Sequence, residues 1–198
     1  KRWGRVSAFT LIFITLTGGC LLYYHQQQKE EARDEWERCR ILYWSGAYSQ
    51  AVESYAEHYE GMKLDARYLF EYGHSLHKLH RNEESNIILQ EALKVSSDPM
   101  ILNIIGKNFQ EMQQYKEAEH WLLRSTHRLP GRIYPYYLLA KLYQEAGDCF
   151  PSEKMDWAIR MVLETEPKVH SRAIDEMREE VKRIAKNVHS IERKQFGK

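Results

Sequence analysis

A repeat of about 34 residues is the feature that most constrains how this chain can fold. It is clearest over residues 99–132, PMILNIIGKNFQEMQQYKEAEHWLLRSTHRLPGR, where two stretches with helical periodicity are followed by Pro130. Two antiparallel helices can approach closely only where Gly106 and Ala118 remove side-chain bulk, and large residues then fill the space around them. The pattern consists of Leu102, Ile105, Gly106 and Phe109 on a first helix and of Tyr115, Ala118, Leu122 and Ser125 on a second. Because each hairpin buries apolar residues against the next, the pattern predicts an all-α solenoid.

The same pattern recurs on both sides of this copy. The matching residues are Trp36, Leu42, Gly46, Tyr48, Ala51 and Tyr55 in the first copy, Gly73, Leu76, Ser85, Leu89 and Ala92 in the second, and Tyr136, Leu139, Ala140, Tyr143 and Gly147 in the fourth. In the fourth copy the register slips near Pro151, and the second helix runs to Pro167. We therefore predict about four repeats over residues 32–167. Residues 168–198 are predicted to form a charged helix whose apolar side caps the last repeat.

The order of large, small, aromatic and proline positions resembles the tetratricopeptide-repeat motif. This resemblance implies that the first helix of each hairpin lines a concave surface that binds a partner. The predicted partner-binding residues are Trp36, Arg40, Tyr43, Trp44, Phe70, His74, His77, Lys78, Asn103, Lys107, Tyr137 and Lys141. Aromatic side chains among cations suit an extended acidic peptide, or a sugar that stacks on a ring while its hydroxyls or phosphates meet Lys and Arg. Alternatively, Trp36, Tyr43 and Trp44 could pack against a preceding helix or a bilayer surface.

Two stretches in the C-terminal half resemble a more specific family. Both are similar to the C-terminal repeat region of O-antigen ligase family membrane proteins. They are LPGRIYPYYLLAKLYQEAGD (129–148) and MDWAIRMVLETEPKVHSRAIDEMREEV (155–181). The residues that carry this resemblance are Arg132, Tyr134, Pro135, Tyr137, Leu138, Leu139, Ala140, Tyr143, Lys168, Val169, Ser171 and Glu176. It implies that the chain is the accessory tail of a glycan-assembly protein whose transfer chemistry resides in other membrane helices. A first residue that is Lys1 and not Met is expected for such a fragment.

The N-terminal segment predicts a membrane anchor. Residues 6–24, VSAFTLIFITLTGGCLLYY, carry no charge, and a helix of this length spans roughly the hydrocarbon core of a bilayer. Residues 1–5 form a basic flank, aromatic residues stand at both ends, and residues 25–31 form a polar spacer to the repeats. We therefore expect a transmembrane helix over 6–24. The alternatives are a buried core helix and a lipoprotein-type signal that ends at Cys20.

The predicted location follows from the charges beside this segment. Lys1, Arg2 and Arg5 precede it, so the positive-inside rule places the N-terminus in the cytoplasm. The chain is accordingly expected in the bacterial inner membrane, with a periplasmic repeat domain and the membrane itself as one partner.

Several classes of function are disfavoured by composition and by missing motifs. Lys and Arg number 29 and Asp and Glu 28, so no global charge favours nucleic acid. Three cysteines without paired spacing predict neither a disulfide framework nor a zinc site. His74, His77 and His80 could share a helix face, but no carboxylate or cysteine completes a metal set with them. No phosphate loop and no GxSxG are present, so we predict no catalytic site, metal or cofactor in this chain.

Two functional hypotheses remain. The first is a membrane-anchored interaction module that holds a protein or glycan partner, either as the tail of an O-antigen ligase-like protein or as a stand-alone scaffold or lipoprotein. The second is a part of an enzyme that contributes substrate binding in cis.

Overall fold

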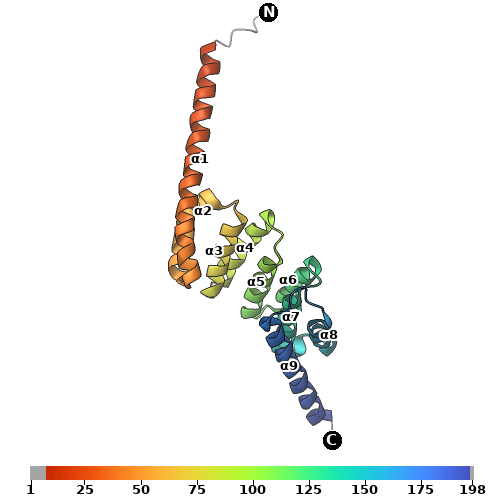
Figure 1. The fold of residues 1–198 in the computed structure, drawn as a ribbon. Coiled ribbons are helices and arrows are strands. Elements are labelled where there is room, and N and C mark those ends of the chain that lie inside the picture. Colours follow the sequence, from red (N-terminus) through yellow and green to blue (C-terminus); the bar gives the residue numbers. More distant parts are fainter. Residues whose placement is uncertain (1–7, 197–198) are drawn as a thin grey trace, which may run out of the picture.

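The computed structural model describes residues 8–196, except for the side chains of residues 8–12, 32 and 187–196. Within that range the chain is entirely helical, which confirms the all-α prediction. Helices follow one another as antiparallel hairpins from α1 to α8, and α9 closes the row (Figure 1). The elements are α1 (Ala8–Ser45), α2 (Tyr48–Met62), α3 (Ala66–Lys78), α4 (Asn82–Val95), α5 (Pro99–Glu111), α6 (Tyr115–Arg128), α7 (Ile133–Ala146), a 3-10 turn η1 (Gly147–Cys149), α8 (Ser152–Glu164) and α9 (Arg172–Phe196).

Two aspartates define where the first helices of the middle hairpins begin. Asp65 Oδ1 accepts hydrogen bonds from the backbone N–H groups of Arg67 and Tyr68, both at 2.9 Å, at the start of α3. Asp98 accepts one from Met100 N–H at 2.9 Å, and Pro99 occupies the first turn of α5. These caps satisfy N–H groups that have no partner inside the helix, so the chain enters both helices at a defined residue.

The turn inside each hairpin uses a left-handed residue. Positive φ angles occur at Gly46 (81°), His80 (57°), Gln113 (59°) and Gly147 (53°). These positions are 34, 33 and 34 residues apart, so the repeat period recurs in the backbone conformation. Glycine adopts this conformation without the steric cost that His80 and Gln113 incur.

Replacing Gln113 by glycine is expected to raise the free energy of unfolding by about 0.5–1 kcal/mol, because the strain of a left-handed non-glycine residue is relieved. The control is Gln114→Gly, since Gln114 has φ of −88° and gains nothing from glycine. Urea unfolding of both variants measures the difference. Equal destabilisation by the two changes would contradict the strain at Gln113.

The hairpins are held close by residues with little or no side chain. A Cβ added to Gly73 would lie 2.6 Å from Leu89 Cγ, and one added to Gly106 would lie 2.7 Å from Leu122 Cγ. Leu89 and Leu122 are fully buried and fill the space above these glycines. The small positions predicted from the repeat therefore mark the points of closest helix approach.

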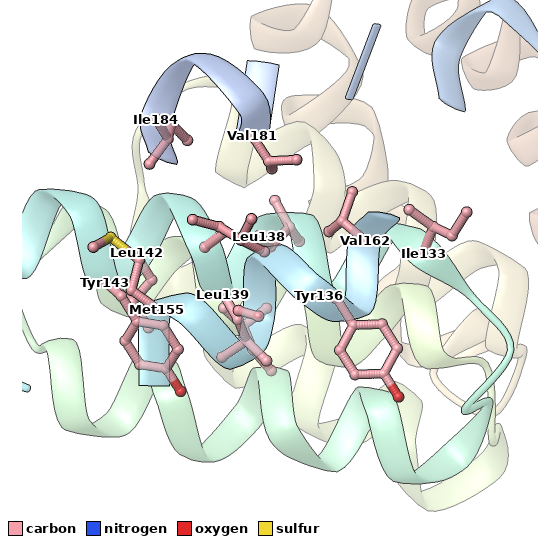
Figure 2. Close-up of a cluster of buried hydrophobic side chains, with 14 of the residues drawn as sticks. Ile133, Tyr136, Leu138, Leu139, Leu142, Tyr143, Met155, Val162, Val181 and Ile184 are labelled. Atoms are coloured by element: carbon pink, nitrogen blue, oxygen red, sulfur yellow. The ribbon is translucent and has the colours of Figure 1, made fainter. Parts of the chain in front are cut away.

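Helix α9 closes the C-terminal end of the solenoid. Val181 and Ile184 lie over Leu138 of α7 and join the buried cluster formed by α7 and α8 (Figure 2). Arg178 donates to the carbonyl oxygens of Val162 (3.3 Å) and Thr165 (3.0 Å), so α9 is also fastened to the end of α8. Helix α9 therefore covers the apolar side of the last described hairpin, formed by α7 and α8.

The prediction of a transmembrane helix over residues 6–24 is wrong. None of the helices that the structure describes is both long enough and apolar enough to cross a membrane. Helix α1 begins at Ala8, becomes polar at His25 and continues without a break to Ser45. Its apolar part, residues 8–24, is about 25 Å long at 1.5 Å per residue, less than the roughly 30 Å of bilayer hydrocarbon, and it contains threonines and two glycines. The basic flank, residues 1–5, lies outside the described residues.

The membrane partner and the inner-membrane location both depended on that helix. Neither gains support from the fold, and the periplasmic placement of the repeats stays a prediction.

Candidate functional site

The candidate site is the surface formed by the first helices of the hairpins. We call it the first-helix face; it consists of residues 33–45 of α1 together with α3, α5 and α7, which contact one another in that order. Side-chain contacts join each helix to the next. They are Arg40–Glu71, His77–Asn108 and Gln110–Glu145, and Tyr137–Glu180 continues the series to α9. The twelve residues predicted to bind a partner therefore belong to one face, but they differ widely in exposure.

At the N-terminal end, a buried carboxylate organises the first two hairpins. Glu71 accepts hydrogen bonds from Trp36 Nε1 (2.8 Å) and from the Tyr55 hydroxyl (3.2 Å). Arg40 Nε lies 3.3 Å from the other oxygen of Glu71. Trp36 is only 5% exposed, so it packs in the core and does not line an open groove, contrary to prediction. Arg40 is engaged in the same network, which also includes Glu37.

Aromatic residues gather beside this network. Tyr43 bonds through its hydroxyl to His74 Nδ1 at 2.7 Å, and Phe70 stacks on the His74 ring. Trp44 is 72% exposed and meets Tyr43 edge-on. Together with residues from α3 and α5 they line a pocket of about 440 Å³. Its lining consists of Arg40, Tyr43, Trp44, Ala66, Arg67, Phe70, Glu71, Ser96, Asp98 and Ile101.

His74 and His77 are not cations at neutral pH in this fold. Burial, aided by Lys78, lowers the pKa of His74 to about 4. Burial and the neighbouring Lys107 likewise lower the pKa of His77. His77 Nδ1 lies 2.7 Å from Asn108 Oδ1, and Asn108 Nδ2 donates to Ser85 Oγ and Asn86 Oδ1, both at 2.8 Å. The two histidines thus contribute packing and neutral hydrogen bonds instead of positive charge.

The structure buries three further predicted residues, Tyr43, His77 and Asn103. His77 is 4% exposed and Asn103 is 2% exposed, so neither side chain reaches the groove, contrary to prediction. His77 lies against Asn108 of the neighbouring first helix, α5. Lys78, one residue after His77, is exposed.

Three lysines remain on the open part of the face, and their environments differ. Lys141 lies 3.3 Å from Glu180 of α9 and contacts the Tyr137 ring. Lys78 and Lys107, by contrast, form no ion pair with any described side chain. Burial and the charge of Lys78 lower the pKa of Lys107, Glu111 acts in the opposite direction, and Lys141 adds a smaller lowering effect. Lys107 is therefore a half-buried cation among like charges.

Lys107 and Lys141 line a second pocket on this face. Its volume is about 400 Å³. The lining consists of Lys107, Gln110, Glu111, Tyr134, Tyr137, Leu138, Lys141 and Glu145. Cations beside two tyrosine rings can receive an anionic group and an apolar one at the same time.

The three histidines of the sequence HSLHKLH diverge. His74 bonds to Tyr43, His77 to Asn108, and His80 to Glu111 at 3.0 Å. In the part of the chain that the structure describes, no group of three or more His, Cys, Asp or Glu side chains is placed to hold a metal ion.

Sequence reasoning missed Glu71 as the organiser of the N-terminal end. A signal was present, because the corresponding positions of the next two repeats hold the buried apolar residues Ile104 and Leu138. A carboxylate at an otherwise apolar repeat position indicates a buried polar network.

Solved structures with the same arrangement of helices include two of MamA. A crystal structure of MamA protein matches with a TM-score of 0.61 at 15% identity, covering 86% of this chain and 95% of that one. "MamA 41-end" from Desulfovibrio magneticus RS-1 matches with a TM-score of 0.59 at 20% identity, covering 85% and 97%. A putative kinesin light chain of Podosopora anserina, described as having nearly identical TPR-like repeats, matches with a TM-score of 0.52 at 15% identity, covering 85% and 98%. No family model and no curated protein matches the chain.

These likenesses determine the fold class. The chain is a tetratricopeptide-like solenoid. The resemblance of the sequence to the tetratricopeptide-repeat motif is therefore confirmed at the level of the fold. The three neighbours contain no O-antigen ligase, so the narrower resemblance still rests on the sequence alone.

Proposed function

We propose that this chain is a protein-interaction module that binds an extended, acidic segment of a partner protein along the first-helix face. The observation that carries the proposal is Lys107, a half-buried cation that has Lys78, Lys141 and Glu111 as charged neighbours and forms no ion pair with any described side chain. Holding such a charge in the free protein costs energy, and a carboxylate from a partner would relieve that cost. The tetratricopeptide-like fold supports a binding role, because stacked hairpins create extended surfaces of this kind.

The shape and chemistry of the face favour a peptide over a compact ligand. The pocket beside Trp44 and Phe70 offers exposed aromatic surface, and the second pocket offers Lys107 and Lys141 beside Glu111 and Glu145. An extended chain can place an apolar side chain in the first pocket and an acidic one in the second. We further propose that the chain acts by binding and not by catalysis, since the face carries cations and aromatic rings without a nucleophile beside a general base.

Replacing Lys78 and Lys107 by glutamine is expected to weaken peptide binding about 10- to 30-fold, because two charged contacts to the ligand are lost. The probe is a fluorescein-labelled decapeptide library with Glu fixed at alternate positions, and the affinity of its best binder is measured by fluorescence anisotropy. A matched library carries Gln at the same positions, and it is expected to bind weakly. The melting temperature should not fall, because the change also removes repulsion between the lysines.

The matched control is Lys94→Gln with Lys116→Gln, which removes the same charge from exposed residues of α4 and α6. This control should bind like the wild type. Equal affinity for the Glu and Gln libraries, or equal weakening by the control variant, would overturn the proposal.

The resemblance to the O-antigen ligase family supports a wider context for this module. We propose that it is the tail of a glycan-assembly protein, where it would hold a partner protein or a glycan beside the enzyme. The coding sequence upstream of Lys1 tests this directly. A series of hydrophobic segments there would support it, whereas a start codon immediately before Lys1 would support the alternative, a stand-alone scaffold.

A further inference from the structure

Another cavity lies apart from the two pockets of the first-helix face. It is formed where the α6–α7 loop and the α8–α9 loop meet the first turns of α9. It measures about 740 Å³, which is within the size range of small-ligand sites. The lining residues are Leu129, Pro130, Gly131, Arg132, Ile133, Tyr134, Pro167, Lys168, Val169, Ile174 and Met177. All of them fall within the two stretches, 129–148 and 155–181, that resemble the O-antigen ligase family.

The charges around this cavity have one sign. Arg132 and Lys168 are the only charged residues of its lining, and neither forms an ion pair with any described side chain. Helix α7 begins beside Arg132 without a side-chain cap, so its first N–H groups add to the positive potential. The remaining walls are largely apolar, and Val169 is 74% exposed. The cavity is therefore complementary to a ligand that carries an anionic group on an apolar body.

Hydrogen bonds to backbone groups hold in place the two loops that form the cavity. The 129–132 turn is closed by a hydrogen bond from Arg132 N–H to the Leu129 carbonyl (3.0 Å), and the Tyr136 hydroxyl donates to the Pro130 carbonyl (3.2 Å). On the other side, the bonds of Arg178 to the carbonyls of Val162 and Thr165 fasten α9 beside the loop that carries Lys168. A ligand would thus meet a largely preformed site.

The cavity is continuous with the first-helix face. Tyr134 lines both this cavity and the pocket that contains Lys107 and Lys141. Its ring stacks on Tyr137 with centroids 6.3 Å apart, so the two tyrosines form an aromatic bridge between the sites. A chain that leaves Lys107 can cross this bridge and enter the cavity.

We infer that the cavity between the α6–α7 and α8–α9 loops binds a second segment of the same partner, one in which acidic residues follow a large apolar residue. The inference rests on the proposed peptide-binding function and extends it to a named site. The apolar side chain contacts Leu129, Ile174 and Met177, while the carboxylates meet Arg132 and Lys168. A peptide is favoured over an isolated anion because the continuous path past Tyr134 suits an extended chain.

The test measures binding of a fluorescein-labelled Phe-Leu-Glu-Glu peptide, with an amidated C-terminus, to the full chain by fluorescence anisotropy. Arg132→Gln with Lys168→Gln is expected to weaken binding at least about tenfold, because both charged contacts are removed. The Phe-Leu-Gln-Gln peptide should bind the wild type as weakly. The matched control, Lys116→Gln with Arg160→Gln, removes one lysine and one arginine charge from exposed residues of α6 and α8 and should have no effect.

The outcomes separate this inference from the proposed function. If Arg132→Gln with Lys168→Gln binds the tetrapeptide like the wild type, or if the wild type does not bind it, the cavity assignment is overturned. The proposed function is judged separately, by the effect of Lys78→Gln with Lys107→Gln on the decapeptide. Tighter binding of dihexanoyl phosphatidate than of the tetrapeptide, lost in the Arg132 and Lys168 variant, would assign the cavity to a lipid phosphate and overturn the peptide assignment.

Discussion

Replacing Glu71 by leucine is expected to lower the free energy of unfolding by about 3–5 kcal/mol. The carboxylate is 3% exposed and is bound by Trp36, Tyr55 and Arg40. Leucine fills a similar space but leaves a buried indole N–H and a buried hydroxyl without their acceptor, and Arg40 loses one of its two carboxylate partners, keeping Glu37. Each unpaired buried group costs about 1–3 kcal/mol.

Urea unfolding followed by circular dichroism measures this loss of stability. Two further variants serve as comparisons. Glu71→Gln keeps one acceptor oxygen and should cost clearly less than leucine. Glu57→Leu changes an exposed glutamate of α2 and should stay within about 0.5 kcal/mol of the wild type. If Glu71→Leu were as mild as Glu57→Leu, the carboxylate would not be the organiser of the first two hairpins.

Replacing Gly106 by alanine is expected to cost about 2–3 kcal/mol, because the new methyl group would lie 2.7 Å from Leu122 Cγ. The change would otherwise be favourable, since alanine forms helix better than glycine by about 1 kcal/mol. A net loss of unfolding free energy would therefore result from the close approach of α5 and α6 and not from helix propensity.

The control for this prediction is Gly131→Ala, where an added Cβ meets nothing within 4 Å. A double variant, Gly106→Ala with Leu122→Ala, adds a second check. Removing the leucine makes room for the new methyl group, so the two changes together should cost less than the sum of the single changes. Strict additivity would contradict direct contact between the two positions.

Repeat periodicity predicted the hairpins and their contact points well. Gly73, Gly106 and Ala118 were identified as small positions because helix packing demands them there, and these sites prove to be points of closest approach. The apolar composition of the N-terminal segment, by contrast, led to the wrong prediction of a transmembrane helix. An uncharged stretch predicts a membrane span only if it is both long enough and apolar enough, and none of the described helices combines the two.

The predicted residues lie on the first-helix face, but several of their side chains are more deeply buried than the sequence indicated. Counting along the repeat placed Trp36, His77 and Asn103 on the first-helix face, and they do belong to it. Their side chains are nevertheless buried, because the packing of neighbouring helices is not contained in the counting along one helix.

The sequence by itself determined the helical repeat, the direction in which each hairpin packs and the face that carries the cations. Only the tertiary structure decided which cations are available. Lys107 and Lys141 occupy equivalent repeat positions, 34 residues apart, yet Lys141 is paired with Glu180 of α9 and Lys107 has no ion-pair partner among the described side chains. The cavity at Arg132 and Lys168 likewise exists only because two loops distant in sequence meet beside α9. Spacing along one helix specifies which side a residue faces, whereas the packing of several helices specifies what it meets there.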